Sequence, residues 1–112
     1  MKNKSEINFK VTLDENHIPE KIEWDATDAG IEGLKEAKAM IISLWDATEN
    51  NTLRFDLWTK DMMLSEMKHF FFQSLITMSD TYERATNDSE IANEMREFGK
   101  MIGEKMLVNT NK

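Results

Sequence analysis

Few side chains in this sequence are spaced for chemistry, and the best candidates are Glu66 and His69. They lie three residues apart in a stretch of helical periodicity, which is the spacing of carboxylate and imidazole ligands in di-metal helix bundles. Such a site needs two pairs of this kind, whereas the only other histidine, His17, falls in an expected turn. On a helical wheel His69 also points about 160° away from Phe71 in the apolar stripe, toward the polar side. A solvated pair is the favoured interpretation, and we predict no metal site.

Other signatures of catalysis are missing from the sequence. The chain has no cysteine, which excludes thiol nucleophiles, thiolate metal sites and disulfides. It contains no Gly-rich phosphate loop, no HExxH and no GxSxG motif. Ser74 lies in an apolar stripe, where a small residue allows close packing. We therefore expect a protein that is not an enzyme and that holds no cofactor.

Length and charge restrict the remaining classes. A chain of 112 residues is expected to form one domain, residues 1–112. Its net charge of −7 argues against nucleic acid and anionic membrane surfaces as ligands, because phosphate binding needs clustered Lys and Arg. No apolar run is long enough to cross a bilayer, and the first residues alternate without an apolar leader. We expect a cytoplasmic protein without membrane insertion.

Four strands are predicted by period-two alternation of apolar and polar residues. They span about residues 5–13, 20–26, 37–46 and 52–59, with turns at residues 14–17 and 46–51 and a loop at residues 27–35. The first two strands should pair as a hairpin. The third strand is apolar on both faces, which is typical of a central strand that is covered on both sides. Together the four strands predict an antiparallel meander.

Two helices are predicted to follow, at about residues 61–86 and 88–107. Asp61 or Ser65 is expected to cap the first, and Asn87 with Glu90 resembles a capping box for the second. The result is an α+β fold of order ββββαα, with the helices packed on one face of the sheet. A helix of about 25 residues extends about 37 Å, whereas a seven-residue strand extends about 23 Å. The surplus apolar surface of the first helix then needs the second helix or another subunit.

The helices carry two groups of candidate interface residues. Phe72 and Ile76 form an apolar ledge, rotated about 100–140° from the main stripe of the first helix. Either the second helix covers this ledge, or a subunit or partner does. Gly99 and Gly103 lie together on the second helix, where each costs about 1 kcal/mol relative to Ala. Close approach of the first helix is the favoured reason, and backbone contact with a second subunit is the alternative.

The sheet carries the third group, Ile41, Trp45 and Trp58. A sheet face with these residues is too apolar for open solvent, and Trp is a frequent interface anchor. We read this face as evidence for a homo-oligomer or a protein partner. Nine of the residues are methionines, most of them on expected core stripes. Met adapts to irregular surfaces and is common at promiscuous binding sites.

Four segments carry a resemblance to a known family: IPEKIEWDATDAG (residues 18–30), AKAMIISLWD (37–46), LRFDLWTKDM (53–62) and SDTYERATND (79–88). In this order they resemble the gliding-motility protein family GldC. The resemblance covers nearly the whole chain and implies a small accessory protein of the gliding apparatus. It implies no catalytic or binding residues.

The function that we expect is therefore a non-enzymatic accessory or adaptor role in bacterial gliding motility, through contacts with proteins of the gliding or export machinery. The predicted topology is also similar to the layout of the export chaperone SecB, although analogy of fold is a weak warrant for function. The alternative is a SecB-like holdase, in which a groove lined by Met and aromatic residues binds non-native segments of exported motility proteins.

Overall fold

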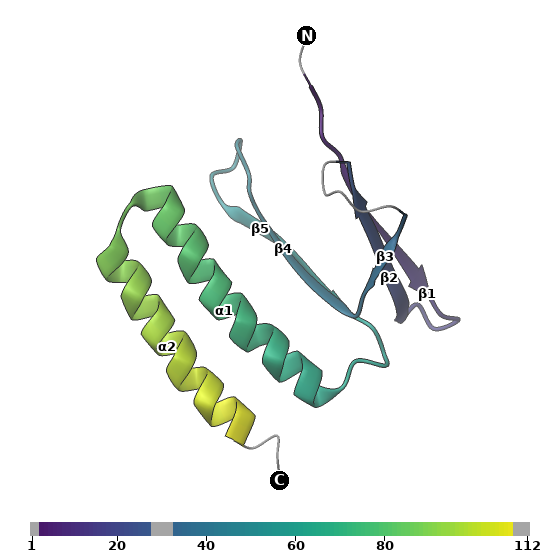
Figure 1. Ribbon diagram of the computed structural model, residues 1–112. Coiled ribbons are helices and arrows are strands. Elements are labelled where there is room, and N and C mark those ends of the chain that lie inside the picture. Colours follow the sequence, from purple (N-terminus) through teal and green to yellow (C-terminus); the bar gives the residue numbers. More distant parts are fainter. Residues whose placement is uncertain (1–2, 28–32, 109–112) are drawn as a thin grey trace. The chain divides into compact units, whose positions relative to one another are not determined.

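The computed structural model describes residues 3–27 and 33–108. The chain forms two compact units, Met1–Met62 and Met63–Lys112. Among the described residues, the first unit contains five strands in two antiparallel sheets, and the second contains two helices (Figure 1). The α+β class is as predicted. The expected single domain and the expected packing of the helices on a sheet face stay predictions.

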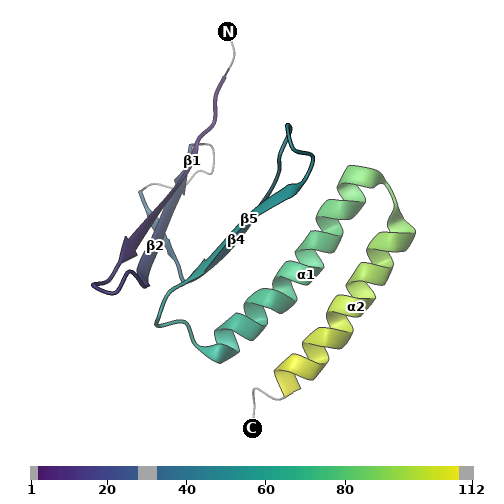
Figure 2. The ribbon, with the colours of Figure 1, turned by 180° about the vertical axis from the view of Figure 1, so that it is seen from behind.

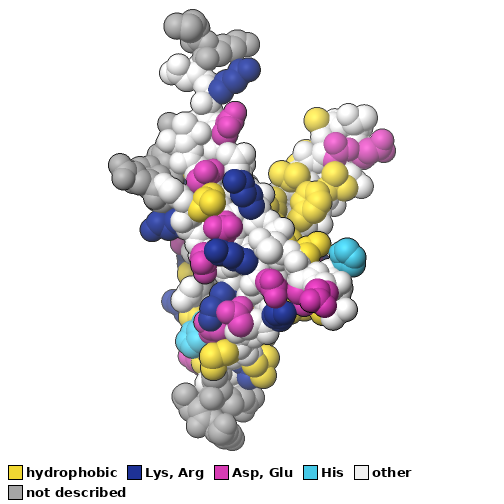
Figure 3. Space-filling view, turned by 90° about the vertical axis from the view of Figure 1, so that its right-hand side faces the viewer, with side chains coloured by type: hydrophobic (Ala, Val, Ile, Leu, Met, Phe, Trp, Pro, Cys, Tyr) yellow, Lys and Arg dark blue, Asp and Glu magenta, His cyan; other side chains and the backbone are white. Residues whose placement is uncertain are grey.

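The first sheet is built from β1 (Ile7–Leu13), β2 (Pro19–Ala26) and the short β3 (Lys35–Ala37), in that order. The hairpin of β1 and β2 is as predicted, with Val11 opposite Ile22 and Phe9 opposite Trp24. Paired residues of antiparallel strands share a face. One face of the hairpin is therefore apolar, and the other is polar, with Lys10 opposite Glu23. Figure 3 shows basic and acidic side chains interspersed on the face that it presents.

The turn between β1 and β2 is organised by Asp14. Its carboxylate accepts hydrogen bonds from the backbone N–H groups of Asn16 and Ile18, at 2.8 and 3.0 Å. His17 adopts a positive φ of 62°, which the preceding Asx geometry accommodates. The predicted turn at residues 14–17 is thus present. Of the predicted loop at residues 27–35, residues 28–32 lie outside the described residues.

The predicted four-stranded meander is wrong at the third strand. Residues 37–46 do not form one central strand, because the chain bends at Lys38 and changes its partner. β3 pairs with β2, whereas β4 (Ala39–Trp45) pairs only with β5 (Thr52–Trp58) within the part of the chain that the structure describes. The buried Thr59 fixes this bend, since its backbone N–H donates to the carbonyl of Lys38 at 2.7 Å.

The second unit is a helical hairpin of α1 (Leu64–Thr86) and α2 (Ser89–Val108). Both ribbon views show the two helices side by side and antiparallel (Figures 1 and 2). The predicted start of α1 at residue 61 is wrong, because Asp61 instead accepts a 2.6 Å hydrogen bond from the Thr59 hydroxyl. The N-cap is Met63, whose N–H donates to the Glu66 carboxylate at 2.9 Å, so neither Asp61 nor Ser65 caps the helix.

The junction between the helices differs from the prediction by one residue. Asn87 is the C-cap of α1 in the left-handed conformation, with φ of 57°, and its N–H donates to the carbonyl of Glu83. Asp88 takes the capping role that was predicted for Asn87, because its carboxylate accepts the N–H of Ile91 at 3.2 Å. Asn tolerates the left-handed conformation that ends a helix, and Asp caps the next one well.

Candidate functional site

The β4–β5 hairpin presents apolar side chains on both of its faces. The register places three apolar pairs on one face: Met40 with Leu57, Ile42 with Phe55, and Leu44 with Leu53. We call this the paired apolar face. Leu44, Leu53 and Phe55 are each about half exposed. The face has no polar member, so it is a surface that needs cover.

The opposite face of the hairpin carries Ile41, Trp45 and Trp58, and we call it the tryptophan face. The register places these residues on one side, as the sequence pattern predicts. Trp45 is 68 % exposed and Trp58 is 56 % exposed. Between them, Arg54 and Asp56 form an exposed ion pair at 3.2 Å. The face therefore combines two indole anchors near opposite ends of the hairpin with a polar centre.

The ledge and the two glycines of the sequence analysis meet inside the helical hairpin. A Cβ built on Gly103 would fall on the Phe72 ring, and one built on Gly99 would lie 3.0 Å from Cδ1 of Ile76. Both glycines are buried. These contacts favour the interpretation in which the second helix covers the ledge of Phe72 and Ile76. Close approach of the two helices then accounts for the two glycines. We therefore base no external interface on these four residues.

An ion-pair network closes the same seam at the other end of the hairpin. Arg96 of α2 donates to Asp80 at 2.8 Å and to Glu83 at 2.6 Å, both on α1. The Arg96 hydrogen bond, with a smaller contribution from Ser89, holds the pKa of Glu83 below its ordinary value. Glu83 and Asp80 in turn raise the pKa of Arg96. The network ties the two helices together.

A shallow groove runs between the helices on another side of the hairpin. Its volume is about 290 Å³, and it is lined by Leu75, Met78, Ile91, Glu94, Met95 and Phe98. Five of these six side chains are apolar, and two are methionines. The sequence analysis places most methionines on expected core stripes, and it names none of these six residues as part of a surface. The helical periodicity that finds a stripe does not reveal what covers it.

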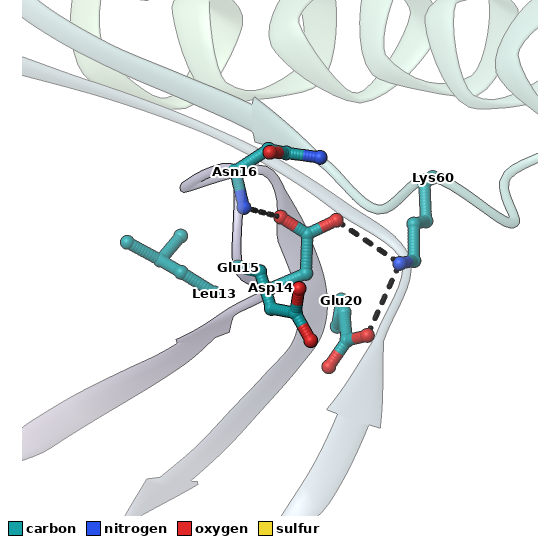
Figure 4. A pocket seen from close by; sticks show the side chains of 6 residues that line it. All are labelled: Leu13, Asp14, Glu15, Asn16, Glu20 and Lys60. Atoms are coloured by element: carbon teal, nitrogen blue, oxygen red, sulfur yellow. Dashed lines mark hydrogen bonds and ion pairs between the residues drawn. The ribbon is translucent and has the colours of Figure 1, made fainter.

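A polar pocket of about 480 Å³ lies beside the β1–β2 turn, around Lys60 (Figure 4). The Lys60 amine lies 3.1 Å from Asp14 and 3.1 Å from Glu20. The backbone N–H of Ile18, more than Lys60, lowers the pKa of Asp14, and Asp14 and then Glu20 raise the pKa of Lys60. An amine that acts as a nucleophile or base needs a lowered pKa. The arrangement links the turn to the segment after β5, and we assign it no chemistry.

The residues that the sequence analysis considered as metal ligands, Glu66, His69 and His17, have the following positions in the structure. Glu66 caps α1, as described above, and His69 is exposed on the same helix. His17 occupies the β1–β2 turn. Among residues 3–27 and 33–108 there is no group of three or more His, Asp or Glu side chains that could hold a metal ion. Within the same residues, no helix is both long and apolar enough to cross a membrane.

Comparison with known proteins gives one match. The family described as "Gliding motility-associated protein GldC-like" matches residues 19–108. The match includes β2 through α2, and so contains the tryptophan face, the paired apolar face and the groove between the helices. No curated protein and no solved structure matches the chain.

Proposed function

This chain belongs to the GldC-like family of gliding motility-associated proteins, and we propose that it acts there as a non-enzymatic adaptor through protein–protein contacts. Its partners in this proposal are proteins of the gliding or export machinery. The cytoplasmic location, the homo-oligomeric state and the exclusion of nucleic acid belong to the same proposal. The net charge of −7 supports the last of these, because no excess of basic side chains is available to bind phosphates.

The observation that carries the proposal is the tryptophan face of β4–β5. Two indole rings, each more than half exposed, are costly in solvent and are the side chains most enriched among binding hot spots. The Arg54–Asp56 pair between them supplies polar groups that give orientation rather than affinity. A face with aromatic anchors around a polar centre suits a folded partner with matching pockets.

A pull-down from a gliding bacterium tests the adaptor role. The bait is the tagged wild-type chain, compared with the double variant Trp45→Ser and Trp58→Ser. Lys10→Ser is the matched control, because Lys10 is exposed on the polar face of another strand. We expect one or two defined gliding components to be captured by the wild type and the control, and lost with the double variant. Equal capture by all three would contradict the proposal.

A holdase similar to SecB is the second candidate, and the groove between the helices favours it. Met78 and Met95 line this groove beside Phe98, and flexible thioether side chains adapt to varied apolar segments. The holdase predicts that the protein suppresses aggregation of several unrelated unfolded chains, and that Met78→Asp weakens the effect. No suppression at several-fold molar excess would exclude this candidate.

A further inference from the structure

The β4–β5 hairpin has two outer edges, and its hydrogen bonds show which backbone groups face them. At the turn, the N–H of Asp46 donates to the carbonyl of Asn51 at 2.8 Å. At the other end, the N–H of Thr59 donates to the carbonyl of Lys38 at 2.7 Å. Opposite residues of an antiparallel pair alternate between bonded and non-bonded positions. Counted along the register of the hairpin, both ends give the same assignment of these positions.

The outer edge of β4 follows from this assignment. Met40, Ile42 and Leu44 occupy bonded positions, so their backbone groups pair with β5. The N–H and C=O groups of the alternate residues point away from β5, and these residues are Ala39, Ile41, Ser43 and Trp45. Among the described residues, no other strand pairs with this edge. The edge is therefore a row of backbone donors and acceptors that lacks a partner strand.

The helical unit cannot supply the missing strand. A helix can exclude water from a strand edge, but it cannot complete the ladder, because its own N–H and C=O groups are bonded along the helix. This holds wherever α1 and α2 lie. A two-stranded ribbon is marginally stable by itself, and a third strand stabilises it. An extended chain segment is therefore the element that matches the edge.

The sequence of β4 lacks the features that protect a strand edge. Of the five strands in the described residues, β4 alone has no charged side chain, and it also contains no Pro or Gly. Its two isoleucines and its tryptophan favour an extended chain. The outer edge of β5 instead carries the Arg54–Asp56 ion pair, and charged side chains on an edge discourage further strands. Strand addition is thus favoured at β4 and opposed at β5.

We propose that the outer edge of β4 binds an extended basic segment of a partner protein, which joins the hairpin as a third strand. Main-chain hydrogen bonds supply the affinity in this mode of recognition. Charge selects a basic partner, because the chain carries a net charge of −7. The turn at residues 46–51 adds Asp46 and Glu49 beside the end of β4, and it contains no basic residue. The proposal goes beyond the proposed function, since it uses the backbone edge of β4 and not the two indoles.

Amide hydrogen exchange of the full chain tests the proposal. The probe is a synthetic peptide of alternating Lys and Val with the length of β4, because it is basic and favours an extended conformation. We expect fast exchange of the N–H groups of Ile41 and Ser43 in the free chain, and exchange at least about tenfold slower with saturating peptide. The N–H groups of Ile42 and Leu44 already pair with β5 and should change less. A peptide of alternating Glu and Val is the matched control, and it should bind at least about tenfold more weakly.

Two proline variants locate the bound strand. Ser43 and Arg54 lie directly opposite one another, and neither N–H belongs to the β4–β5 ladder. Proline is therefore tolerated at both positions, and it blocks pairing on the edge where it stands. We expect Ser43→Pro to raise the dissociation constant of the Lys–Val peptide at least about tenfold, and Arg54→Pro to change it less than about threefold. Ser43→Lys keeps the backbone N–H and should also weaken binding, because its charge repels a basic strand, so it replaces Ser43→Pro if that variant unfolds.

Slow exchange of Ile41 and Ser43 in the free chain would overturn the proposal, because this chain would then cover the edge itself. Equal loss of peptide binding in the two proline variants, or equal binding of the Lys and Glu peptides, would also overturn it. The double variant Trp45→Ser and Trp58→Ser keeps the backbone edge, so its binding of the Lys–Val peptide would support the proposal. If the wild type binds this peptide but captures no gliding component, the proposed adaptor role fails and the inference about the β4 edge stands.

Discussion

The two hairpins of this chain differ in whether they bury residues of their own. The helical hairpin α1–α2 has a seam of its own, in which Ser79, Ala92, Gly99 and Gly103 are buried. The strand hairpin β4–β5 has no fully buried residue along either strand. Small residues let two helices approach until the backbone of one contacts the side chains of the other. A two-stranded ribbon has no second layer, and it is marginally stable without one.

This difference separates stability from binding in the molecule. Side chains in the helical seam act on folding, because removing them opens a packed contact. Side chains on the faces of β4–β5 instead contribute to binding the surface that covers them. Substitutions in the two hairpins should therefore give different ratios of lost stability to lost binding.

The largest effect is expected for Phe72→Asp, in the helical seam. The change removes the ring that lies against Gly103 and places a carboxylate there, which should cost about 4 kcal/mol or more of unfolding free energy. Chemical denaturation followed by far-ultraviolet circular dichroism measures the loss. Gln73→Asp is the control on the exposed side of the same helix. A folded Phe72→Asp variant that loses only a partner would show that Phe72 is an interface residue after all.

The glycines should differ from each other by a smaller amount. Gly103→Ala forces the Phe72 ring to move, and overpacking of this kind costs about 1–3 kcal/mol. Gly99→Ala needs a shift of only a few tenths of an ångström from the end of Ile76, and the better helix propensity of Ala offsets it. Thermal unfolding should rank wild type and Gly99→Ala close together and Gly103→Ala below both. Equal melting temperatures for the two alanine variants would contradict this account of the seam.

The response of the helices to pH should be more moderate. Because folding lowers the pKa of Glu83 from its ordinary value of 4.5, its carboxylate stabilises the fold above that pH. The stabilisation is lost as the pH falls below 4.5 and through the lowered pKa. We expect the melting temperature to fall in this window, and Arg96→Gln to lower it near neutral pH and to flatten the dependence. A slope that persists unchanged in Arg96→Gln would assign the titration to another carboxylate.

The smallest effect on stability is expected for Trp45→Ser. The indole is 68 % exposed, so its loss should change the unfolding free energy by less than about 1 kcal/mol. The same substitution should weaken partner binding by more than about 2 kcal/mol if the ring is an anchor. Denaturation and titration with the captured partner measure the two numbers on one preparation. Strong destabilisation with unchanged binding would reverse the comparison between the hairpins.

Much of the local structure could be predicted because it depends on neighbouring residues. The alternation in residues 7–13 and 19–26 defines one apolar face, and the Asp14 turn then fixes the hairpin. The turn at residues 46–51 is likewise local: Asp46 accepts from Glu49 through its side chain and from Asn50 through its carbonyl. Helix ends were predicted less well, since Asp61, Asn87 and Asp88 can each serve several capping or turn roles.

For the candidate sites, local sequence patterns decided which residues share a face but not what covers that face. The sequence placed Ile41, Trp45 and Trp58 on one face, because strand periodicity alone decides that. It left open whether Phe72 and Ile76 face a helix or a partner, and the contacts with Gly103 and Gly99 now favour the helix. It also missed Met78, Ile91 and Phe98 as surface residues, because a stripe looks the same whether or not something covers it.

The sequence by itself determined the α+β class, the two helices, the β1–β2 hairpin, the absence of thiol chemistry and the family resemblance. These follow from composition and from periodicity over a few residues. Only the tertiary structure decided that the strand predicted at residues 37–46 bends at Lys38 and divides between two sheets, and that the glycines of α2 receive the ring of Phe72 and the side chain of Ile76. Both outcomes depend on pairings between residues that are distant in the chain. Such pairings are chosen by the free energy of the whole packed arrangement, which no local pattern encodes.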